Sequence, residues 1–86
     1  MPRFSVVIPA FNAAATLNRA ISSVCTQSFP AHEIIVVDDG SSDATAEVAR
    51  KFGARIRLIA QANGGVAAAR NAGAGTATGD WLAGLE

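Results

Sequence analysis

Residues 33–43, Glu33-Ile-Ile-Val-Val-Asp-Asp-Gly-Ser-Ser-Asp43, decide the fold of this chain. The run is apolar at every position from 34 to 37, as in strands that are buried on both faces of a parallel sheet. Two acids, a glycine and two serines follow, so the strand ends in a turn rich in residues that cap helices. The stretch therefore predicts a central strand that leads directly into a helix.

The residues before this stretch show the same alternation of strand and helix. Residues 4–8 form a first strand, and we expect Pro9 to end it because proline cannot donate to a sheet ladder. Asn12 is a good N-cap for a helix over residues 13–27. The helical spacing of three apolar residues predicts its buried face: Leu17, Ile21 and Val24.

The residues after this stretch continue the alternation. We expect a helix over 44–52 that Gly53 ends, a strand over 55–59, a helix of small residues over 66–74, and a further strand from 79. The order β-α-β-α-β-α-β predicts an α/β fold. Its sheet is open, mostly parallel and Rossmann-like, with helices on both faces.

Length and charge limit the classes of protein that this chain can represent. Its 86 residues, with 7 Lys and Arg against 7 Asp and Glu, predict one domain over residues 1–86 with no net charge. Such a balance argues against nucleic-acid binding through phosphates. No apolar run reaches the roughly 20 residues of a membrane span, and we expect no signal peptide before the first strand. With a single cysteine, we expect a cytoplasmic protein.

Three segments should meet at the carboxyl edge of the sheet, where open α/β folds bind ligands. They are residues 9–12, the acid pair Asp38 and Asp39, and residues 61–65. Phe11 offers a flat face on which a nucleobase can stack, and an ionised Asp39 can accept a ring N–H, so the pair suits a uracil-like ring. The alternative is structural: Phe11 is a core aromatic and Asp39 caps the following helix.

The other polar residues near this edge have functional and structural interpretations too. One acid of the pair at 38 and 39 should face the ligand, and the other should face the sheet or the turn amides. We expect Asp43 to be a solvated acid of the first helical turn. Residues 63–65 can offer backbone N–H groups to an anion. Arg70 suits a phosphate or a neighbouring acid. The glycines match neither the dinucleotide fingerprint nor the P-loop.

Three remaining residues of chemically active types have ordinary structural interpretations. Cys25 should pack as a small apolar residue, His32 should be a surface histidine with no second metal ligand at a suitable spacing, and Trp81 should lie in the core.

Four motifs cover most of the chain: Phe4-Ser-Val-Val-Ile-Pro-Ala-Phe-Asn12, Ile35-Val-Val-Asp-Asp-Gly-Ser-Ser-Asp43, Asn63-Gly-Gly-Val-Ala-Ala-Ala-Arg-Asn-Ala-Gly73 and Gly79-Asp-Trp-Leu82. In this order and spacing they resemble the family 2 glycosyltransferases, a large inverting family with a GT-A fold. The resemblance implies transfer of a sugar from a nucleoside diphosphate donor, most simply a UDP-sugar, to an acceptor hydroxyl. It also implies Mg²⁺ or Mn²⁺ bridging the diphosphate in the full-length enzyme.

The resemblance further implies a substrate site at the following residues: Pro9, Phe11, Asn12, Asp38, Asp39, Asn63, Gly64 and Arg70. Phe11 would stack on the base beside Pro9, and Asp39 would accept its N–H. Asp38 would support the loop, Arg70 would lie near the diphosphate or order the acidic loop, and the segment at 63–64 would close the site.

The chain departs from the family pattern at its end. In the family, the strand begun at 79–82 continues into an aspartate-rich metal motif, whereas this chain reads Ala83-Gly-Leu-Glu86. We therefore expect the metal motif and the general base to lie beyond residue 86, so that these residues carry no catalytic group, bind no metal and are inactive alone. Leu85-Glu86 resembles a cloning remnant, and surfaces exposed by such a truncation predict a homo-oligomer.

Two other functions remain as alternatives. A receiver-like phosphoacceptor domain also places paired acids at a strand end, but there the pair follows the first strand, and Lys51 lies within a helix here. A nucleotidyltransferase shares the broad fold, but its glycine-rich basic loop is absent from residues 10–15.

Overall fold

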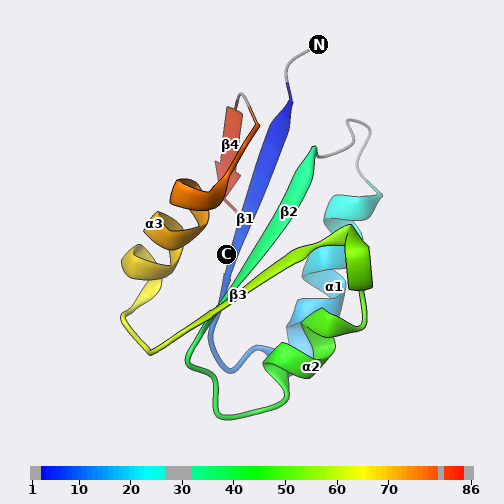
Figure 1. Ribbon diagram of the computed structural model, residues 1–86. Helices are drawn as coiled ribbons and strands as arrows, with labels where there is room; N and C mark the ends of the chain where they lie inside the picture. Colours follow the sequence, from blue (N-terminus) through cyan, green and yellow to red (C-terminus); the bar gives the residue numbers. More distant parts are fainter. Residues whose placement is uncertain (1–2, 27–31, 80, 85–86) are drawn as a thin grey trace.

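The structure is a computed structural model that describes residues 3–26, 32–79 and 81–84, the last four by their backbone. Its strands form one parallel sheet in the order β3-β2-β1-β4 (Figure 1). The elements run β1 (Phe4–Ala10), α1 (Ala14–Cys25), β2 (Glu33–Asp39), α2 (Thr45–Arg50), a 3₁₀ turn (Gly53–Arg55), β3 (Arg57–Gln61), α3 (Val66–Thr76) and β4 (Trp81–Gly84). The expected α/β architecture and order of elements are confirmed.

Strand β2 lies between β1 and β3 and forms the centre of the sheet. It pairs with β1 from Ser5 opposite Glu33 onward, and with β3 as far as Asp39 opposite Gln61. Ile35 and the two valines that follow it are fully buried, as expected for a strand covered on both faces.

Helices cover both faces of the sheet (Figure 1). Helices α1 and α2 pack on one face, where β1 and β2 contribute the side chains at 6, 8, 34 and 36 to a core that includes Leu17, Ile21 and Val24. Helix α3 covers the other face through Ala69, which packs with Val7, Ile35 and Val37. The buried stripe expected for α1 is therefore confirmed.

Several boundaries differ from those expected. Strand β1 does not end at Pro9 but continues to Ala10, with Pro9 opposite Val37. The pairing of β1 with β4 stops at Val7, so Pro9 has one described strand neighbour, and proline is tolerated where one side of a strand lacks a ladder. Strand β3 begins two residues later than expected, and α3 continues to Thr76.

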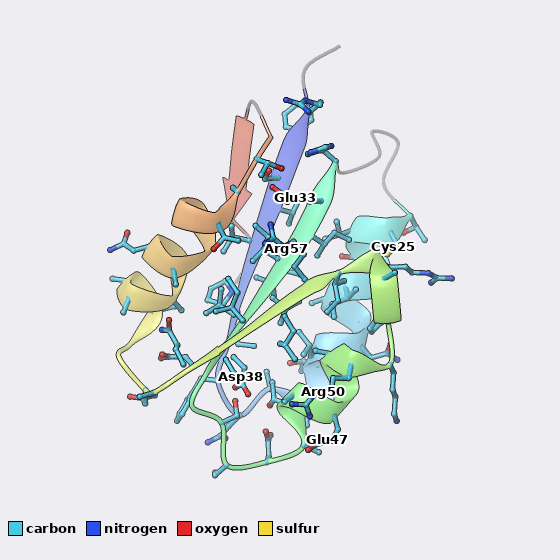
Figure 2. All side chains as sticks on the ribbon, in the orientation of Figure 1. Cys25, Glu33, Asp38, Glu47, Arg50 and Arg57 are labelled. Carbon is cyan, nitrogen blue, oxygen red and sulfur yellow. The ribbon has the colours of Figure 1, made fainter. Side chains whose placement is uncertain are left out.

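Cys25 is also placed differently from the expectation. It is exposed at the end of α1, because it lies just beyond the edge of the buried stripe (Figure 2). The expected helical residue 27 and the side chain of Trp81 lie outside the described residues.

At the amino-terminal edge of the sheet, Glu33 joins β2 to the segment that enters β4. It accepts hydrogen bonds from Ser5 Oγ (2.7 Å), from Thr78 N and from Thr78 Oγ1, and it pairs with Arg57 at 3.6 Å (Figure 2). Burial by itself would raise the pKa of Glu33, but these contacts together lower it to about 2. These contacts link the strands at the edge of the sheet opposite the expected ligand site.

No helix in the described part of the chain is long and apolar enough to cross a bilayer.

Candidate functional site

The loops that follow β1, β2 and β3 all leave from one edge of the sheet (Figure 1). A pocket of about 210 Å³ lies at this edge. Its lining includes four predicted site residues, Pro9, Phe11, Asp39 and Asn63. Ala10 and Gly65 belong to the segments expected to meet there, whereas Val66 and Ala69 are residues that sequence reasoning missed. The apolar spacing of the first turn of α3 was the available signal for Val66 and Ala69.

The wall of the pocket is largely apolar, and two of its side chains are exposed. Phe11 is 54% exposed and Val66 is 53% exposed, and they are the large apolar residues that stand out from the described surface. The alternative interpretation of Phe11 as a core aromatic is therefore wrong. Its ring is available to a ligand in the pocket.

Asp39 forms the polar end of the pocket, although the residue is only 3% exposed. Its Oδ1 accepts from Gln61 Nε2 and from Gly64 N, both at 2.9 Å. Its Oδ2 accepts from Gly65 N at 2.9 Å and, more weakly, from Asn63 Nδ2 at 3.4 Å. The hydrogen bonds from Gln61 and from the two glycine amides lower the pKa of Asp39 below its ordinary value.

These contacts change the role expected for the loop before α3. Residues 64 and 65 direct their N–H groups at Asp39, so these amides are engaged by an internal carboxylate and do not point at a ligand anion. Asp39 also does not cap α2, the helix that follows it. Because Asp39 lies opposite Gln61 in the sheet, the loop after β3 folds back over the carboxylate and places it at the start of α3.

Asp38 faces the turn, so the two acids divide as expected. Its Oδ1 accepts from Ser41 N at 3.0 Å, and it does not line the pocket. Between the acids and this serine, Gly40 has a φ of 75°, and a Cβ there would lie 2.7 Å from Asn63 N. Only glycine allows the two loops to approach this closely without strain.

Asn12 is not the N-cap of α1, contrary to the expectation, and it does not line the pocket. It has a φ of 49°, its N–H donates to Ser41 Oγ at 2.9 Å, and its Oδ1 accepts from Ser42 N at 2.8 Å. The left-handed conformation turns the side chain toward the loop after β2. Asn12 therefore ties two loops together directly after Phe11.

The segment that follows β2, through the first residue of α2, supplies two acceptors at the start of α1. Ala13 N donates to Thr45 Oγ1 at 2.9 Å, and Ala14 N donates to Asp43 Oδ2 at 3.2 Å. Asp43 is exposed, as expected of a solvated acid, but it lies just before α2 and also accepts from Thr45 N and Thr45 Oγ1. Hydrogen bonds, first of all from the Thr45 hydroxyl, lower the pKa of Asp43.

Two further predicted residues, Gly64 and Arg70, do not line the pocket. Gly64 belongs to the loop that binds Asp39, and Arg70 is half-buried one turn into α3. His32 is exposed, and its Nε2 lies 3.2 Å from Thr78 Oγ1 at the opposite edge of the sheet. Among the residues described, no three His, Cys, Asp or Glu side chains come together as a metal site would require.

A larger groove of about 650 Å³ lies elsewhere, between α1 and α2. Asn18, Lys51 and Arg55 contribute its polar groups, and none of the residues predicted for the site lines it. The smaller pocket is the better candidate because it combines an exposed aromatic ring with a hydrogen-bonded carboxylate at the carboxyl edge.

Comparison with known proteins identifies relatives over nearly the whole chain. The family model described as "Glycosyl transferase family 2" matches residues 5–86. The succinoglycan biosynthesis protein ExoO of Rhizobium meliloti is 47% identical over 88 residues, which cover all of this chain and 25% of that protein. The uncharacterized glycosyltransferase YibD of Escherichia coli is 39% identical over 84 residues, or 94% of this chain and 24% of the relative. The chain thus spans about a quarter of the length of these relatives.

Solved structures share the fold. Residues 1–349 of TarS from S. aureus, in complex with UDP-GlcNAc, align with a TM-score of 0.84 and 29% identity, over 96% of this chain and 26% of that one. Glucosyl-3-phosphoglycerate synthase from Mycobacterium tuberculosis, in complex with Mn²⁺, UDP and glucosyl-3-phosphoglycerate, aligns with a TM-score of 0.78 and 28% identity. That alignment covers 98% of this chain and 33% of the synthase.

Proposed function

Because this chain belongs to glycosyl transferase family 2, we propose that the pocket beside Phe11 and Asp39 binds the nucleobase of a nucleoside diphosphate sugar. One observation carries the proposal. An exposed aromatic ring and an ionised carboxylate share one small, largely apolar pocket at the carboxyl edge of a GT-A sheet. A nucleobase has a flat face for the ring and an N–H for the carboxylate.

The donor is proposed to be a UDP-sugar. Related structures contain UDP or UDP-GlcNAc, which supports this choice. The imide N–H of uracil is a donor, whereas the corresponding ring nitrogen of cytosine is an acceptor and would face the Asp39 carboxylate unfavourably. The Asp39 carboxylate therefore favours uracil, which has an imide N–H, over cytosine.

Each carboxylate oxygen of Asp39 already accepts two hydrogen bonds. The base can therefore bind to Asp39 only if its N–H replaces one of the present donors. The longest of these contacts is the 3.4 Å bond from Asn63 Nδ2, and Asn63 is exposed and lines the pocket. The ring N–H takes this position on Oδ2. Asn63 Nδ2 keeps its 3.0 Å bond to the carbonyl oxygen of Asp39, so the loop stays attached during the exchange.

The remaining predicted residues act beside the base. Pro9 lines the pocket next to Phe11, and Asn12 and Asp38 hold the two loops that frame it. Gly64 helps to hold the loop over Asp39, and Arg70, on α3, is proposed to lie toward the diphosphate or to order the acidic loop. A guanidinium suits a diphosphate because it donates two parallel hydrogen bonds.

For the whole enzyme we propose transfer to an acceptor hydroxyl with inversion, assisted by Mg²⁺ or Mn²⁺. Mn²⁺ is present in related structures, which supports the metal. Within the described ranges, no three His, Cys, Asp or Glu side chains come together as a site for this ion. We propose that the 86 residues alone bind donor and do not transfer the sugar, because they span about a quarter of the relatives.

A cytoplasmic location completes the proposal. The single cysteine of the chain supports it, because Cys25 is exposed as a thiol and disulfide-rich extracellular domains pair their cysteines.

Titration with UDP, followed by calorimetry or by NMR shifts, tests the proposed function. We expect weak binding without metal, and loss of at least about tenfold in affinity in Asp39→Asn and in Phe11→Ala, since each removes one of the two contacts to the base. Titration with CDP is the matched ligand control and should show weaker binding. A folded chain that does not bind UDP at millimolar concentration would contradict the proposal.

A further inference from the structure

Val66 is an exposed apolar residue at the candidate pocket. It is the first residue of α3, 53% of it is exposed, and it lines the same pocket as Phe11. A β-branched residue is not favoured by helix propensity, and exposed apolar surface gains nothing from water. The remaining large apolar side chains of the described surface, apart from Phe11, are buried or half-buried.

From this placement we infer that Val66 is the second apolar wall of the nucleobase site, so that the base is held between two side chains from different elements. Phe11 comes from the end of β1 and Val66 from the start of α3. The inference rests on the proposed function. It adds Val66 to the nucleobase site as a residue that favours a flat ring over a puckered one. The substrate class is a flat, unsaturated ring.

The start of α3 is held firmly enough to serve as a wall. Ala69 is fully buried against the sheet, and its N–H donates to Gly65 O at 3.1 Å. On the other side, Gly65 N donates to Asp39 Oδ2, and Gly65 has a φ of 93° that few other residues adopt. Val66 follows directly, so its position is fixed by a buried helix turn and by the Asp39 carboxylate.

This arrangement gives Asp39 two effects on the base. It offers an acceptor to the ring N–H, and through the amides of Gly64 and Gly65 it positions Val66. The wall and the acceptor are therefore energetically coupled, and removing the carboxylate should weaken the contribution of the valine.

Two substitutions at position 66 separate shape from apolar contact. Val66→Ala removes two methyl groups and is expected to weaken UDP binding by about fivefold. Val66→Thr keeps the shape but replaces one methyl by a hydroxyl, and should weaken binding by about twofold to threefold. Val48→Ala is the matched control: Val48 lies in the groove between α1 and α2, so this variant should lose stability while its UDP affinity is unchanged.

A second ligand tests whether the site prefers a flat ring. The diphosphate of 5,6-dihydrouridine keeps the imide N–H and both carbonyls, but its saturated ring is puckered. The wild-type chain should bind it more weakly than UDP, and Val66→Ala should reduce this preference. A double-mutant cycle of Val66→Ala with Asp39→Asn should be non-additive, with a smaller loss from the valine when the carboxylate is absent.

The outcomes distinguish this inference from the function on which it rests. Binding of UDP that depends on Phe11 and Asp39 but is unchanged in both position 66 variants would overturn the second wall and leave the nucleotide site standing. An additive cycle would overturn the positioning of Val66 by Asp39. Failure of the folded wild-type chain to bind UDP would overturn the proposed function, and the inference with it.

Discussion

At the scale of single residues, chemically similar side chains take different roles because different donors reach them. Asp38 and Asp39 are adjacent, yet Asp38 accepts from a turn amide and Asp39 accepts from the loop after β3. Glu33, at the other end of the same strand, accepts from Ser5 and Thr78. Each carboxylate on β2 therefore fastens a different part of the chain to the central strand.

Glu33 predicts a dependence of stability on pH. Its pKa in the folded chain is about 2, below its ordinary value of 4.5, so its carboxylate stabilises the fold above about pH 4.5. That contribution should be lost as the pH falls from about 4.5 to about 2, and is worth about 1 kcal/mol once solvent screening is allowed for. Urea unfolding of the wild type and Glu33→Gln at several pH values measures it. Equal stability of the two proteins at neutral pH would contradict the role assigned to Glu33.

At the scale of elements, the two glycines of α3 have opposite environments although they lie two residues apart. A Cβ at Gly73 would clash with the Val7 side chain, whereas a Cβ at Gly75 would meet nothing. The first glycine lets α3 approach β1 closely, and the second only lowers helix propensity.

Alanine substitution of these glycines should therefore give opposite results. Gly75→Ala should stabilise the chain by about 0.5–1 kcal/mol, because it removes a glycine from a helix without a clash. Gly73→Ala should destabilise it by about 1–3 kcal/mol, because the helix must move away from the sheet. Chemical denaturation measures both. Equal effects of the two variants would contradict the close packing of α3 on β1.

The first residue of α2, Thr45, helps to cap α1, and this predicts the effect of removing its hydroxyl. Thr45 is fully buried, and its Oγ1 accepts from Ala13 N. Thr45→Val keeps the shape and should cost about 1–2 kcal/mol, because the amide loses its acceptor. Hydrogen exchange should increase at residue 13. Thr16→Val, on the exposed side of α1, is the control and should have little effect.

At the scale of the whole molecule, the candidate ligand site and the hydrogen-bond network around Glu33 lie at opposite edges of the sheet. The carboxyl edge carries the pocket and the loops that frame it, and the amino edge carries the network around Glu33. Between these edges, helices pack on both faces of the sheet (Figure 1). Substitutions at the amino edge should therefore change stability more than ligand binding.

Self-association stays a prediction at this scale. Strand β3 is an edge strand of the described sheet, and an open strand edge can pair with a second copy. We expect a dimer or larger assembly in multi-angle light scattering, and Ala60→Lys, at an exposed position of β3, should shift it toward the monomer because a lysine blocks an edge. A monomeric mass across the micromolar range would contradict the prediction.

Local patterns in the sequence were sufficient to predict the order of elements, the burial of β2 and the buried face of α1. Each of these depends on a short periodicity: the unbroken apolar run before Asp38 and the helical spacing of Leu17, Ile21 and Val24. The gathering of Phe11, Asp39 and Asn63 was also predictable, because the carboxyl ends of parallel strands share an edge. The family follows from the same motifs.

The tertiary structure alone decided which groups these side chains contact. The register that sets Asp39 opposite Gln61 directs the loop amides to the carboxylate, and the left-handed Asn12 joins the loop after β2 instead of capping α1. The same packing leaves Val66 exposed at the pocket. Sequence patterns report which face of an element is buried, whereas hydrogen-bond partners depend on distances between segments far apart in the chain, and only the packed sheet sets those distances.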